Sequence, residues 1–373
     1  MTNNRHFVFV IGTRAQLIKV APIIVECEKR ALGCTLLMTG QHQETMQDLL
    51  DEFGVRSPQV AALPAKERST IFSLFSWLPQ PYRGIVKKLK ALPVTPQYMD
   101  VLVHGDTLST VLGAIAGKRV GARVVHLESG LTSKKLFDPF PEEIARRIVF
   151  RLSHMAMCPN EETLQHIQKN YPRCAAINTG GNTILDAIRL SGVSRSVVND
   201  SIPYLVASLH RFQNIYEKKR LNDLVKLLQN VAINHRIKFV LHPATRKRLK
   251  KTGLYEKLEQ TNNIELIPRL GYSAFLKLAA ESACVLTDGG SNQEELAAIG
   301  VPTIIMRQAT ERSDGLGGNA IMEGEIRGTV EDYIKSKKYQ ELEAASTLTD
   351  AQQPSVAIVE SLLTVNPCKD LQD

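Results

Sequence analysis

The chain has 373 residues, 43% of them hydrophobic and 23% charged, and a formal net charge of +8. These ordinary globular proportions exclude a disordered chain, a collagen-like repeat and a disulfide-stapled miniprotein. At this length, two to three domains are expected. No apolar run reaches the ~18 residues that span a bilayer and no secretory signal is visible, so we expect a cytoplasmic protein that does not bind membranes.

The excess of basic residues is mild, and its densest cluster lies at 246–251. No nucleic-acid recognition motif accompanies this cluster, and aromatic residues make up only 6% of the chain. The cluster is therefore expected to be the solvated face of a helix, and nucleic acid is not an expected partner. A modest positive balance also suits a small substrate that carries phosphate.

In the first half of the chain, short apolar runs alternate with segments of helical apolar spacing. The runs predict strands at 6–12, 34–40, 100–105 and 123–128. The helical segments follow them at 17–30, 43–53, 108–120 and 142–152. Strands that alternate with helices in this way predict βαβ units, and hence a parallel sheet that is covered on both faces.

This alternation weakens at 192–203, where polar residues cluster, and then restarts. Further strands are predicted at 204–209, 238–241, 264–267, 285–287 and 303–306, and a last helix at 356–363. We therefore predict an α/β protein of two doubly wound Rossmann-like domains, 1–191 and 203–373, that face an interdomain cleft. Such domains bind ligands beyond the carboxyl ends of their strands, so residues just after each strand are the candidates for function.

The first strand ends in Gly12-Thr13-Arg14, with Lys19 about one turn into the following helix. An arginine at a strand end beside a helix N-terminus can bind phosphate with two hydrogen bonds. The same sequence pattern is equally consistent with an arginine that only faces solvent. Neither a G-x-G-x-x-G fingerprint nor a P-loop is present, so a dinucleotide site and a P-loop NTPase are not supported.

Three carboxylates follow, at or near the ends of strands in the first domain. Asp106 comes after the strand at 100–105 and could simply cap the next helix. Glu128 ends an apolar strand, where an unpaired carboxylate is costly to bury, and this favours a functional role. Glu142 opens a helix with Arg146 one turn on; acidic residues are common in a first turn, so this pair alone is not diagnostic.

In the second domain the strand-end residues are suited to binding a phosphate. His210 ends one strand and His242 ends the next. The segment 287–295 reads as a strand, a Gly-Gly-Ser turn and a helix start, whose backbone N–H groups suit a diphosphate. The candidate ligands in and after this segment are Gly289, Gly290, Ser291, Glu295, which could take a ribose diol, and Arg312 in a charged loop.

Taken together and in order, these motifs resemble one family. The blocks are Gly-Thr-Arg, His-Gly-Asp-Thr, His-Leu-Glu-Ser-Gly, Pro-Glu-Glu-x-x-Arg, His-Arg, Asp-Gly-Gly-Ser-x-Gln-Glu-Glu and Thr-Glu-Arg, from about Val8 to Asp314. The series resembles the non-hydrolysing UDP-N-acetylglucosamine 2-epimerases. The resemblance implies the fold shared with GT-B glycosyltransferases, a homodimer, and an enzyme that uses neither a metal nor a nicotinamide cofactor. It also implies that the last helix packs back on the N-terminal domain.

The resemblance also implies a reaction and a set of roles. UDP leaves by anti elimination, which gives 2-acetamidoglucal, and then adds again with inverted configuration at C2. The implied acid–base set is Asp106, Glu128 and Glu142, and His210 holds the leaving phosphate together with Arg14. The remaining implied substrate contacts are Lys19, Arg146, Gly289, Gly290, Ser291, Glu295 and Arg312.

Two details leave the sugar and the regulation open. Gln16 and Thr132 stand where the family commonly has Glu and Arg, so the substrate is UDP-N-acetylglucosamine or a modified relative of it. Gln41-His42-Gln43 resembles a segment that binds a UDP-N-acetylglucosamine activator in some members, and His242 would lie with it. Activation is thus a hypothesis from resemblance alone.

Three other functions fit part of the same pattern. A hydrolysing 2-epimerase would perform the same elimination but release free N-acetylmannosamine and UDP. A GT-B glycosyltransferase would share the fold and the nucleotide turn, without needing three carboxylates in the first domain. A nucleotide-sugar sensor would bind the ligand and not turn it over.

Overall fold

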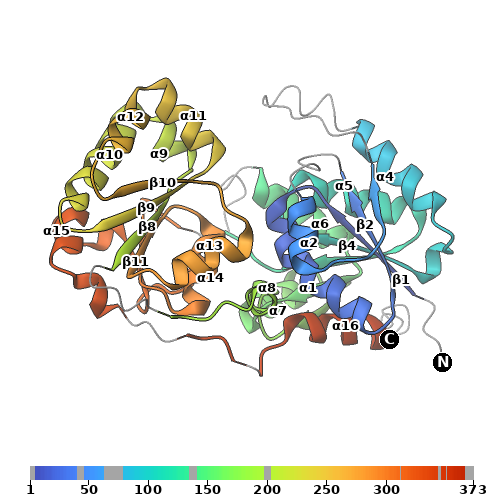
Figure 1. Ribbon diagram of the computed structural model, residues 1–373. Helices are drawn as coiled ribbons and strands as arrows, with labels where there is room; N and C mark the ends of the chain where they lie inside the picture. Colours follow the sequence, from blue (N-terminus) through green and yellow to red (C-terminus); the bar gives the residue numbers. More distant parts are fainter. Residues whose placement is uncertain are drawn as a thin grey trace. The chain divides into compact units, whose positions relative to one another are not determined.

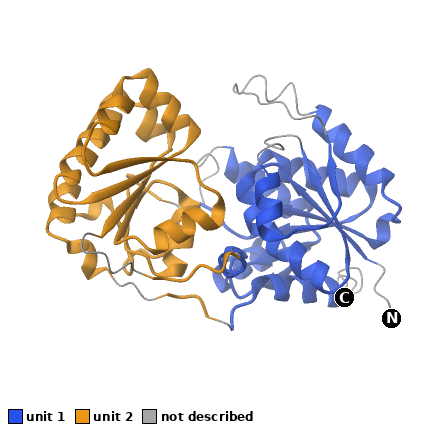
Figure 2. Ribbon diagram, viewed as in Figure 1, with its two compact units in different colours: residues 1–190, 350–373 blue, residues 191–349 orange. Residues whose placement is uncertain are grey.

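The computed structural model describes residues 5–39, 46–62, 79–133, 141–196, 203–310, 312–342, 346–349 and 351–365. The chain forms two compact units, which Figure 2 shows in different colours. Unit 1 comprises residues 1–190 and 350–373, and unit 2 comprises residues 191–349. Unit 2 is therefore shorter than the second domain predicted from the sequence, because the C-terminal segment belongs to unit 1.

Unit 1 is built on a seven-stranded parallel sheet with the order β3-β2-β1-β4-β5-β6-β7 (Figure 1). Its strands are β1 (His6–Ile11), β2 (Gly33–Met38), β3 (Gln59–Ala61), β4 (Met99–His104), β5 (Arg123–Leu127), β6 (Met155–Cys158) and β7 (Ala175–Asn178). The central strands are largely apolar; in β4 every residue is buried, including the polar Asp100 and His104 near its ends. A parallel sheet covered on both faces requires such continuous apolar runs rather than alternating ones.

The helices of unit 1 connect successive strands. They are α1 (Arg14–Lys29), α2 (Gln47–Phe53), α4 (Pro79–Ala91), α5 (Leu108–Val120), α6 (Glu142–Leu152), α7 (Glu161–Asn170) and α8 (Ile184–Ser191), with a 3-10 turn at Pro96–Tyr98. Thr13 and Thr107 cap α1 and α5 with their side chains. A Cβ on Gly12 would collide with the Ser109 hydroxyl, so only glycine lets α5 approach the end of β1 this closely.

Unit 2 has a six-stranded parallel sheet with the order β10-β9-β8-β11-β12-β13. Its strands are β8 (Tyr204–Ser208), β9 (Arg236–Leu241), β10 (Ile264–Pro268), β11 (Cys284–Thr287), β12 (Thr303–Ile305) and β13 (Ala320–Met322). Its helices are α9 (Phe212–Tyr216), α10 (Lys218–Ala232), α11 (Pro243–Lys251), α12 (Leu254–Glu259), α13 (Tyr272–Ala280), α14 (Gly290–Ile299) and α15 (Val330–Lys335), with 3-10 turns at Glu323–Glu325 and Lys338–Glu341.

Each sheet has a point where its strand order reverses direction. In unit 1 this switch point lies between β1 and β4, and in unit 2 it lies between β8 and β11. The helices that follow these two strands leave on opposite faces of the sheet, so a crevice opens at the carboxyl ends, where ligands bind in doubly wound folds. The sheet order therefore directs attention to residues 12–14 and 105–106 in unit 1, and to 209–211 and 288–291 in unit 2.

The chain returns to unit 1 through α16 (Pro354–Thr364), which packs on α1. The guanidinium of Arg123 donates to the carbonyls of Leu362 (2.8 Å) and Val365 (2.7 Å), two of the carbonyls that a helix end leaves without a partner. At the other end of α16, the Ser355 amide donates to Asp186 of α8 at 2.7 Å. Polar contacts thus anchor both ends of the helix to unit 1.

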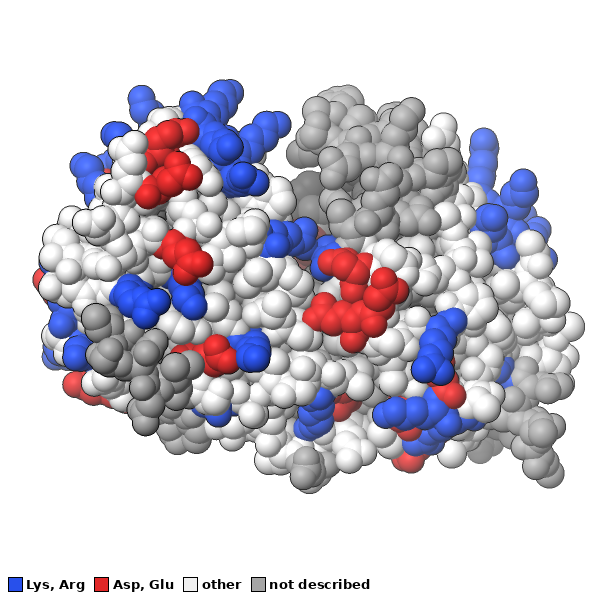
Figure 3. Space-filling model, viewed as in Figure 1, with Lys and Arg blue, Asp and Glu red and all other residues white. Residues whose placement is uncertain are grey.

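Basic side chains lie in separate groups on the face shown in Figure 3, over α11 in unit 2 and over α4 in unit 1. In α11, Thr245 and Leu249 are buried, and Arg246, Lys247 and Lys250 are exposed. The basic cluster predicted at 246–251 is therefore the solvated face of an amphipathic helix. Within the described ranges, no helix combines the length and apolar character needed to cross a bilayer.

Candidate active site

Glu128 follows β5 directly and has a left-handed backbone conformation, with φ at 55°. This region is costly for a non-glycine residue and persists only where the surroundings enforce it. The next two residues do so here. The Ser129 amide donates to the Met157 carbonyl at 2.8 Å. Gly130, with φ at 89°, passes so close to the Thr163 carbonyl that a Cβ would collide with it.

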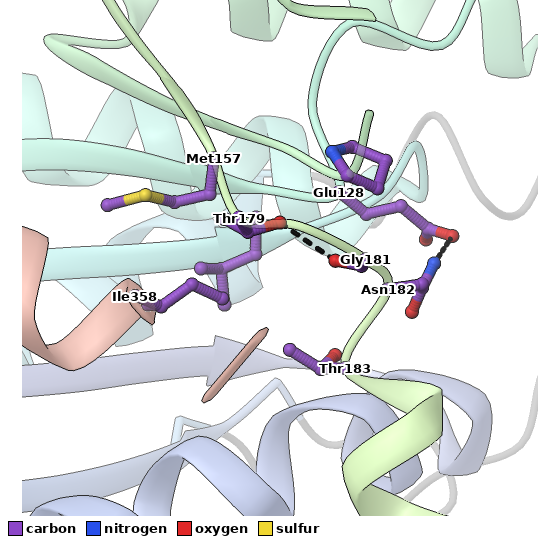
Figure 4. A pocket seen from close by; sticks show the side chains of 9 residues that line it. Glu128, Met157, Thr179, Gly181, Asn182, Thr183 and Ile358 are labelled. Atoms are coloured by element: carbon purple, nitrogen blue, oxygen red, sulfur yellow. Dashed lines mark hydrogen bonds between the residues drawn. The ribbon is translucent and has the colours of Figure 1, made fainter. Parts of the chain in front are cut away.

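The Glu128 carboxylate is nearly buried, with 10% of its side chain exposed. Its Oε1 accepts hydrogen bonds from Lys19 Nζ (2.5 Å) and Asn182 Nδ2 (2.6 Å). His104 Nε2 lies 3.6 Å from its Oε2. A buried ammonium partner and an amide donor on one oxygen stabilise the carboxylate as an anion. The same residue lines a small pocket together with Asn182, Met157 and Ile358 (Figure 4).

The buried His126 of β5 links the residue that follows β4, Gly105, to Ser129, the residue after Glu128. Its Nε2 lies 2.8 Å from the Gly105 carbonyl, and its Nδ1 lies 2.9 Å from Ser129 Oγ. Burial lowers the pKa of His126 to about 4, so the ring is neutral at pH 7. Since a carbonyl can only accept, the proton sits on Nε2, and Ser129 donates to Nδ1. This chain of hydrogen bonds fixes the spacing between the loop of Asp106 and that of Glu128.

Asp106 forms an ion pair with Arg146 of α6, with 2.5 Å between Oδ2 and Nη2. Arg146 also lies 3.4 Å from Glu143, a carboxylate with no solvent exposure. Glu143 accepts from Thr132 Oγ1 (2.6 Å) and Arg147 Nε (3.1 Å). Burial alone raises the pKa of Glu143, but the hydrogen bonds from Thr132, Ser133 and Arg147 outweigh burial and lower it. Glu143 therefore anchors the helix whose Arg146 holds Asp106.

Glu142, the first residue of α6, differs from its neighbour Glu143. Its Oε2 is buried and has no hydrogen-bond partner among the described residues. A buried carboxylate oxygen without a donor is unfavourable when ionised, and it becomes satisfied when the group holds a proton or meets a ligand. Of the three predicted carboxylates, Glu142 is thus the one with a buried oxygen that no described residue contacts by a hydrogen bond.

Just after β1, Arg14 forms an ion pair with a neighbouring helix, and Gln16 links two strands of the sheet. Arg14 pairs with Asp48 of α2 through two short contacts, of 2.5 and 2.9 Å, and is mostly covered. Gln16 is buried; its Oε1 accepts from the amide of Gly12, and its Nε2 donates to the His104 carbonyl at 2.7 Å. A glutamate could not make the second bond, which gives a physical reason for the amide at this position. Gln16 ties β1 to β4 across the switch point.

In unit 2, one buried carboxylate organises the corresponding edge. Asp288, which follows β11, has no solvent exposure and accepts from the amides of His210 and Arg211 and from Asn214 Nδ2 at 2.8 Å. It also lies 3.2 Å from His210 Nδ1. This single side chain therefore fixes both the backbone after β8 and the imidazole of His210. The sequence reasoning did not assign Asp288 a role.

The His210 ring is about one-third exposed and lies 5.4 Å from the ring of His242. Partial burial lowers the pKa of His210, while the charge of Asp288 opposes this shift. His242 also caps α11, accepting from the Ala244 amide at 3.3 Å. The segment proposed to bind an activator with His242, Gln41 to Gln43, lies outside the described residues.

The Gly289-Gly290-Ser291 turn leads into α14, with Gly290 as the first helical residue. Arg312 extends to this helix start, with Nη1 2.8 Å from Glu294 Oε2. The loop that carries Arg312 is held by Gln293, whose Nε2 donates to the Asp314 carbonyl at 2.9 Å. Glu295, the expected ribose ligand, is 3% exposed and belongs to the buried side of the helix. The turn thus joins amides at a helix N-terminus to a nearby guanidinium, a combination suited to anions.

The predicted residues thus gather in two sets. Unit 1 brings together Lys19, Asp106, Glu128 and Arg146 near the carboxyl ends of β4 and β5, and unit 2 brings together His210, His242, the glycine turn and Arg312. Arg14 pairs with Asp48 at the end of β1. No grouping of three or more His, Cys, Asp or Glu that could hold a metal occurs in the described part of the chain.

Comparison with known proteins now adds to this geometry. The family model described as UDP-N-acetylglucosamine 2-epimerase matches residues 25–362. This chain belongs to that family. A UDP-N-acetylglucosamine 2-epimerase of Methanocaldococcus jannaschii is 31% identical over 320 residues, with 82% of this chain and 84% of that protein covered. The Bacillus subtilis enzyme of the same name is 27% identical, with 95% and 94% covered.

Solved structures show the same fold. The Neisseria meningitidis UDP-GlcNAc 2-epimerase bound to UDP-GlcNAc superposes with a TM-score of 0.77 at 24% identity, over 96% of this chain and all of that one. The Methanocaldococcus jannaschii enzyme in complex with UDP-GlcNAc and UDP gives a TM-score of 0.73 at 25% identity, over 96% and 99%. The chain therefore has the GT-B-like α/β fold of this epimerase family.

Proposed function

We propose that the protein inverts C2 of a UDP-N-acetylhexosamine, converting UDP-N-acetylglucosamine, or a modified relative, to its manno epimer. The observation that carries this proposal is the placement of Asp106 and Glu128, with their partners Arg146 and Lys19, at one edge of unit 1 in a chain of the 2-epimerase family. Glu142 begins α6, the helix that carries Arg146. In this account, unit 1 supplies the acid–base groups and unit 2 binds the UDP moiety.

The chemistry explains why several carboxylates are needed. C2 of the sugar has no adjacent carbonyl, so its proton is poorly acidic and direct removal is slow. Elimination avoids this difficulty: a base takes the C2 proton, the C2–H electrons form the C1=C2 double bond, and the C1–O bond to UDP breaks. In the reverse addition, UDP bonds to C1 and a proton is delivered to C2 from the opposite face. A base and an acid on opposite faces are therefore required.

The surroundings of the carboxylates suggest how the roles divide. Glu128, with Lys19 on its Oε1, is suited to the base because its partners favour the anion. Glu142, whose Oε2 has no hydrogen-bond partner among the described residues, is left for the transfer of a proton to C2 on the other face. Asp106 forms an ion pair with Arg146, and we assign it the orientation of the sugar.

Departure of UDP needs stabilisation of the developing negative charge. His210, the Gly289-Gly290-Ser291 turn and Arg312 supply donors and positive charge for the diphosphate. Elimination and re-addition involve no net oxidation, so the proposed reaction requires no redox cofactor. We further propose that the enzyme works in the cytoplasm as a homodimer; light scattering of the purified chain tests the dimer.

The test is incubation with UDP-N-acetylglucosamine in D2O, followed by proton and phosphorus NMR. The proposal predicts loss of the C2 proton signal together with the appearance of UDP-N-acetylmannosamine. Free N-acetylmannosamine and UDP would instead establish a hydrolysing 2-epimerase. Binding without exchange, for this and for modified UDP-sugars, would contradict the proposal and support a sensor.

A further inference from the structure

Asn182 lies in the turn between β7 and α8, far in sequence from the other candidates, yet it contacts Glu128 directly. Its Nδ2 donates to Glu128 Oε1 at 2.6 Å, the same oxygen that Lys19 binds (Figure 4). Asn182 and Glu128 both line the small pocket beside β5. Neither the motifs nor the family resemblance pointed to this residue.

The orientation of the Asn182 amide is fixed by a second hydrogen bond. Its Oδ1 accepts from the Ile184 amide at 3.1 Å, at the start of α8. Because an amide oxygen accepts and its nitrogen donates, this bond leaves the NH2 group facing Glu128. The amide is therefore placed as a donor and cannot turn to present its oxygen without losing the bond to α8.

The turn that carries Asn182 is itself tightly held. Thr179 Oγ1 donates to the Gly181 carbonyl at 2.8 Å, and the Gly180 amide donates to Asn178 Oδ1 at 2.9 Å. Gly180 has φ at 70°, a conformation that glycine adopts without strain. A rigid turn built on β7 thus holds the amide against a carboxylate at the end of β5.

From these contacts we infer that Asn182 is a positioning residue for the base Glu128. Two donors on Oε1 fix the rotation of the carboxylate, and with it the direction of Oε2. They also favour the ionised form that a base requires. Among the described residues, the charged or titratable groups that face Glu128 include Lys19 from α1, His104 from β4 and His126 from β5. This inference rests on the proposed function, in which Glu128 removes the C2 proton.

Two substitutions separate positioning from a merely structural role. Asn182→Asp keeps an oxygen to accept from Ile184 but places a second carboxylate oxygen against Glu128 Oε1. Asn182→Ala removes both bonds without adding charge. If Asn182 served only to cap α8, Asn182→Asp would behave like the wild type and Asn182→Ala would be the more damaging change.

The positioning role predicts the opposite order. In Asn182→Asp, repulsion between the two carboxylates moves the acidic limb of the kcat/KM profile upward by about one pH unit or more. In Asn182→Ala, kcat falls about ten-fold with KM little changed, and the limb moves less. The matched control is Asn178→Asp, which adds the same charge to the same turn but faces away from Glu128, toward Glu161. It should leave the profile unchanged.

The experiment measures C2 proton exchange in D2O against pH for the wild type and these three variants. A companion 13C NMR titration follows the glutamate carboxyl carbons, with the Glu128 signal assigned by its absence in Glu128→Gln. This titration needs no turnover, so it tests the inference even if the wild type fails to exchange, an outcome that would defeat only the proposed function. An upward shift of the Glu128 titration in Asn182→Asp alone supports the inference. Identical titrations in Asn182→Asp and the wild type overturn it.

Discussion

The switch points of the two units have the same topology but place their charges differently. In unit 1, Asp106 and Glu128 each meet a cationic side chain, Arg146 or Lys19, within 2.5 Å. In unit 2, the carboxylate of Asp288 is buried and accepts mainly from backbone amides. Unit 1 thus presents ionisable groups at its edge, whereas unit 2 uses its carboxylate to shape a backbone that suits an anion. The difference accounts for the proposed division between proton transfer and UDP binding.

The largest expected effect comes from removing the cation beside Asp106. Arg146→Met is expected to lower kcat about 100-fold, because Asp106 loses its ion-pair partner at the reacting edge. UDP affinity, which the proposed function assigns to unit 2, should stay within about two-fold of the wild type. The matched control is Arg147→Met, since Arg147 pairs with Glu143 and not with Asp106. Equal losses in both variants would show that only the fold of α6 had been damaged.

The buried histidines of unit 1 should make the protein sensitive to acid. Burial lowers the pKa of His126 to about 4 from 6.5, so the unfolded chain binds the proton more readily. Stability is therefore fully present above pH 6.5 and is lost as the pH falls toward 4. Between pH 7 and pH 5 this one group costs about 2 kcal/mol. Urea unfolding at pH 7 and pH 5 measures this loss in the free energy of unfolding. The loss should be smaller in His126→Gln. An unchanged loss in that variant would contradict the assignment.

In unit 2, the expected effect is on binding rather than on proton transfer. Asp288→Asn places an amide among the donors of His210, Arg211 and Asn214, so at least one of them loses its acceptor. UDP affinity is expected to fall about ten-fold, as for the loss of one charged hydrogen bond. Calorimetry with UDP measures this, and Asp223→Asn on the exposed side of α10 serves as the control. Unaltered UDP binding in Asp288→Asn would contradict the proposal that Asp288 shapes the UDP-binding backbone of unit 2.

The smallest expected effect tests the link between β4 and β5. Ser129→Ala removes the hydroxyl that donates to His126 Nδ1, at a cost of about 1 kcal/mol in the free energy of unfolding. Activity should fall only about three-fold, because the Gly105 bond to the ring remains. Urea unfolding and C2 exchange together measure the change. A loss of activity as large as that of Arg146→Met would assign the hydroxyl a more direct role.

The sequence predicted several of the larger elements because their periodic patterns are long, although α4 (Pro79–Ala91) was not predicted. The structure places α5 at Leu108–Val120 and α6 at Glu142–Leu152, on the predicted ranges. Four strands, β3, β6, β7 and β13, were not predicted because each is short and has at most one β-branched residue, whereas the equally short β11 and β12 have two and three. Periodicity indicated the last helix, and the family resemblance implied that it packs back across the domains. The partners that hold it, such as Arg123, could not be predicted from the sequence.

In the candidate site, residues that follow long apolar strands could be found from sequence, whereas their partners could not. Asp106 and Glu128 are recognisable because each follows a buried strand. Asn182 lies 54 residues from Glu128, and nothing local marks it. Asp288 opens the Asp-Gly-Gly-Ser block, but its bond to the backbone of His210, 78 residues away, could not be predicted locally. Gln16 was noticed only as a departure from a motif, and its role became clear from its bond to His104. Spatial pairing is the information that a single sequence lacks.

The division of labour between the units is tested most directly by measuring two properties of the same three variants. Asp106→Asn, Glu128→Gln and Glu142→Gln are assayed for C2 proton exchange in D2O and for UDP affinity by calorimetry. The account predicts that each variant loses exchange by about 100-fold or more, while each binds UDP nearly as the wild type does. Full exchange in all three, or a parallel loss of UDP affinity, would contradict it.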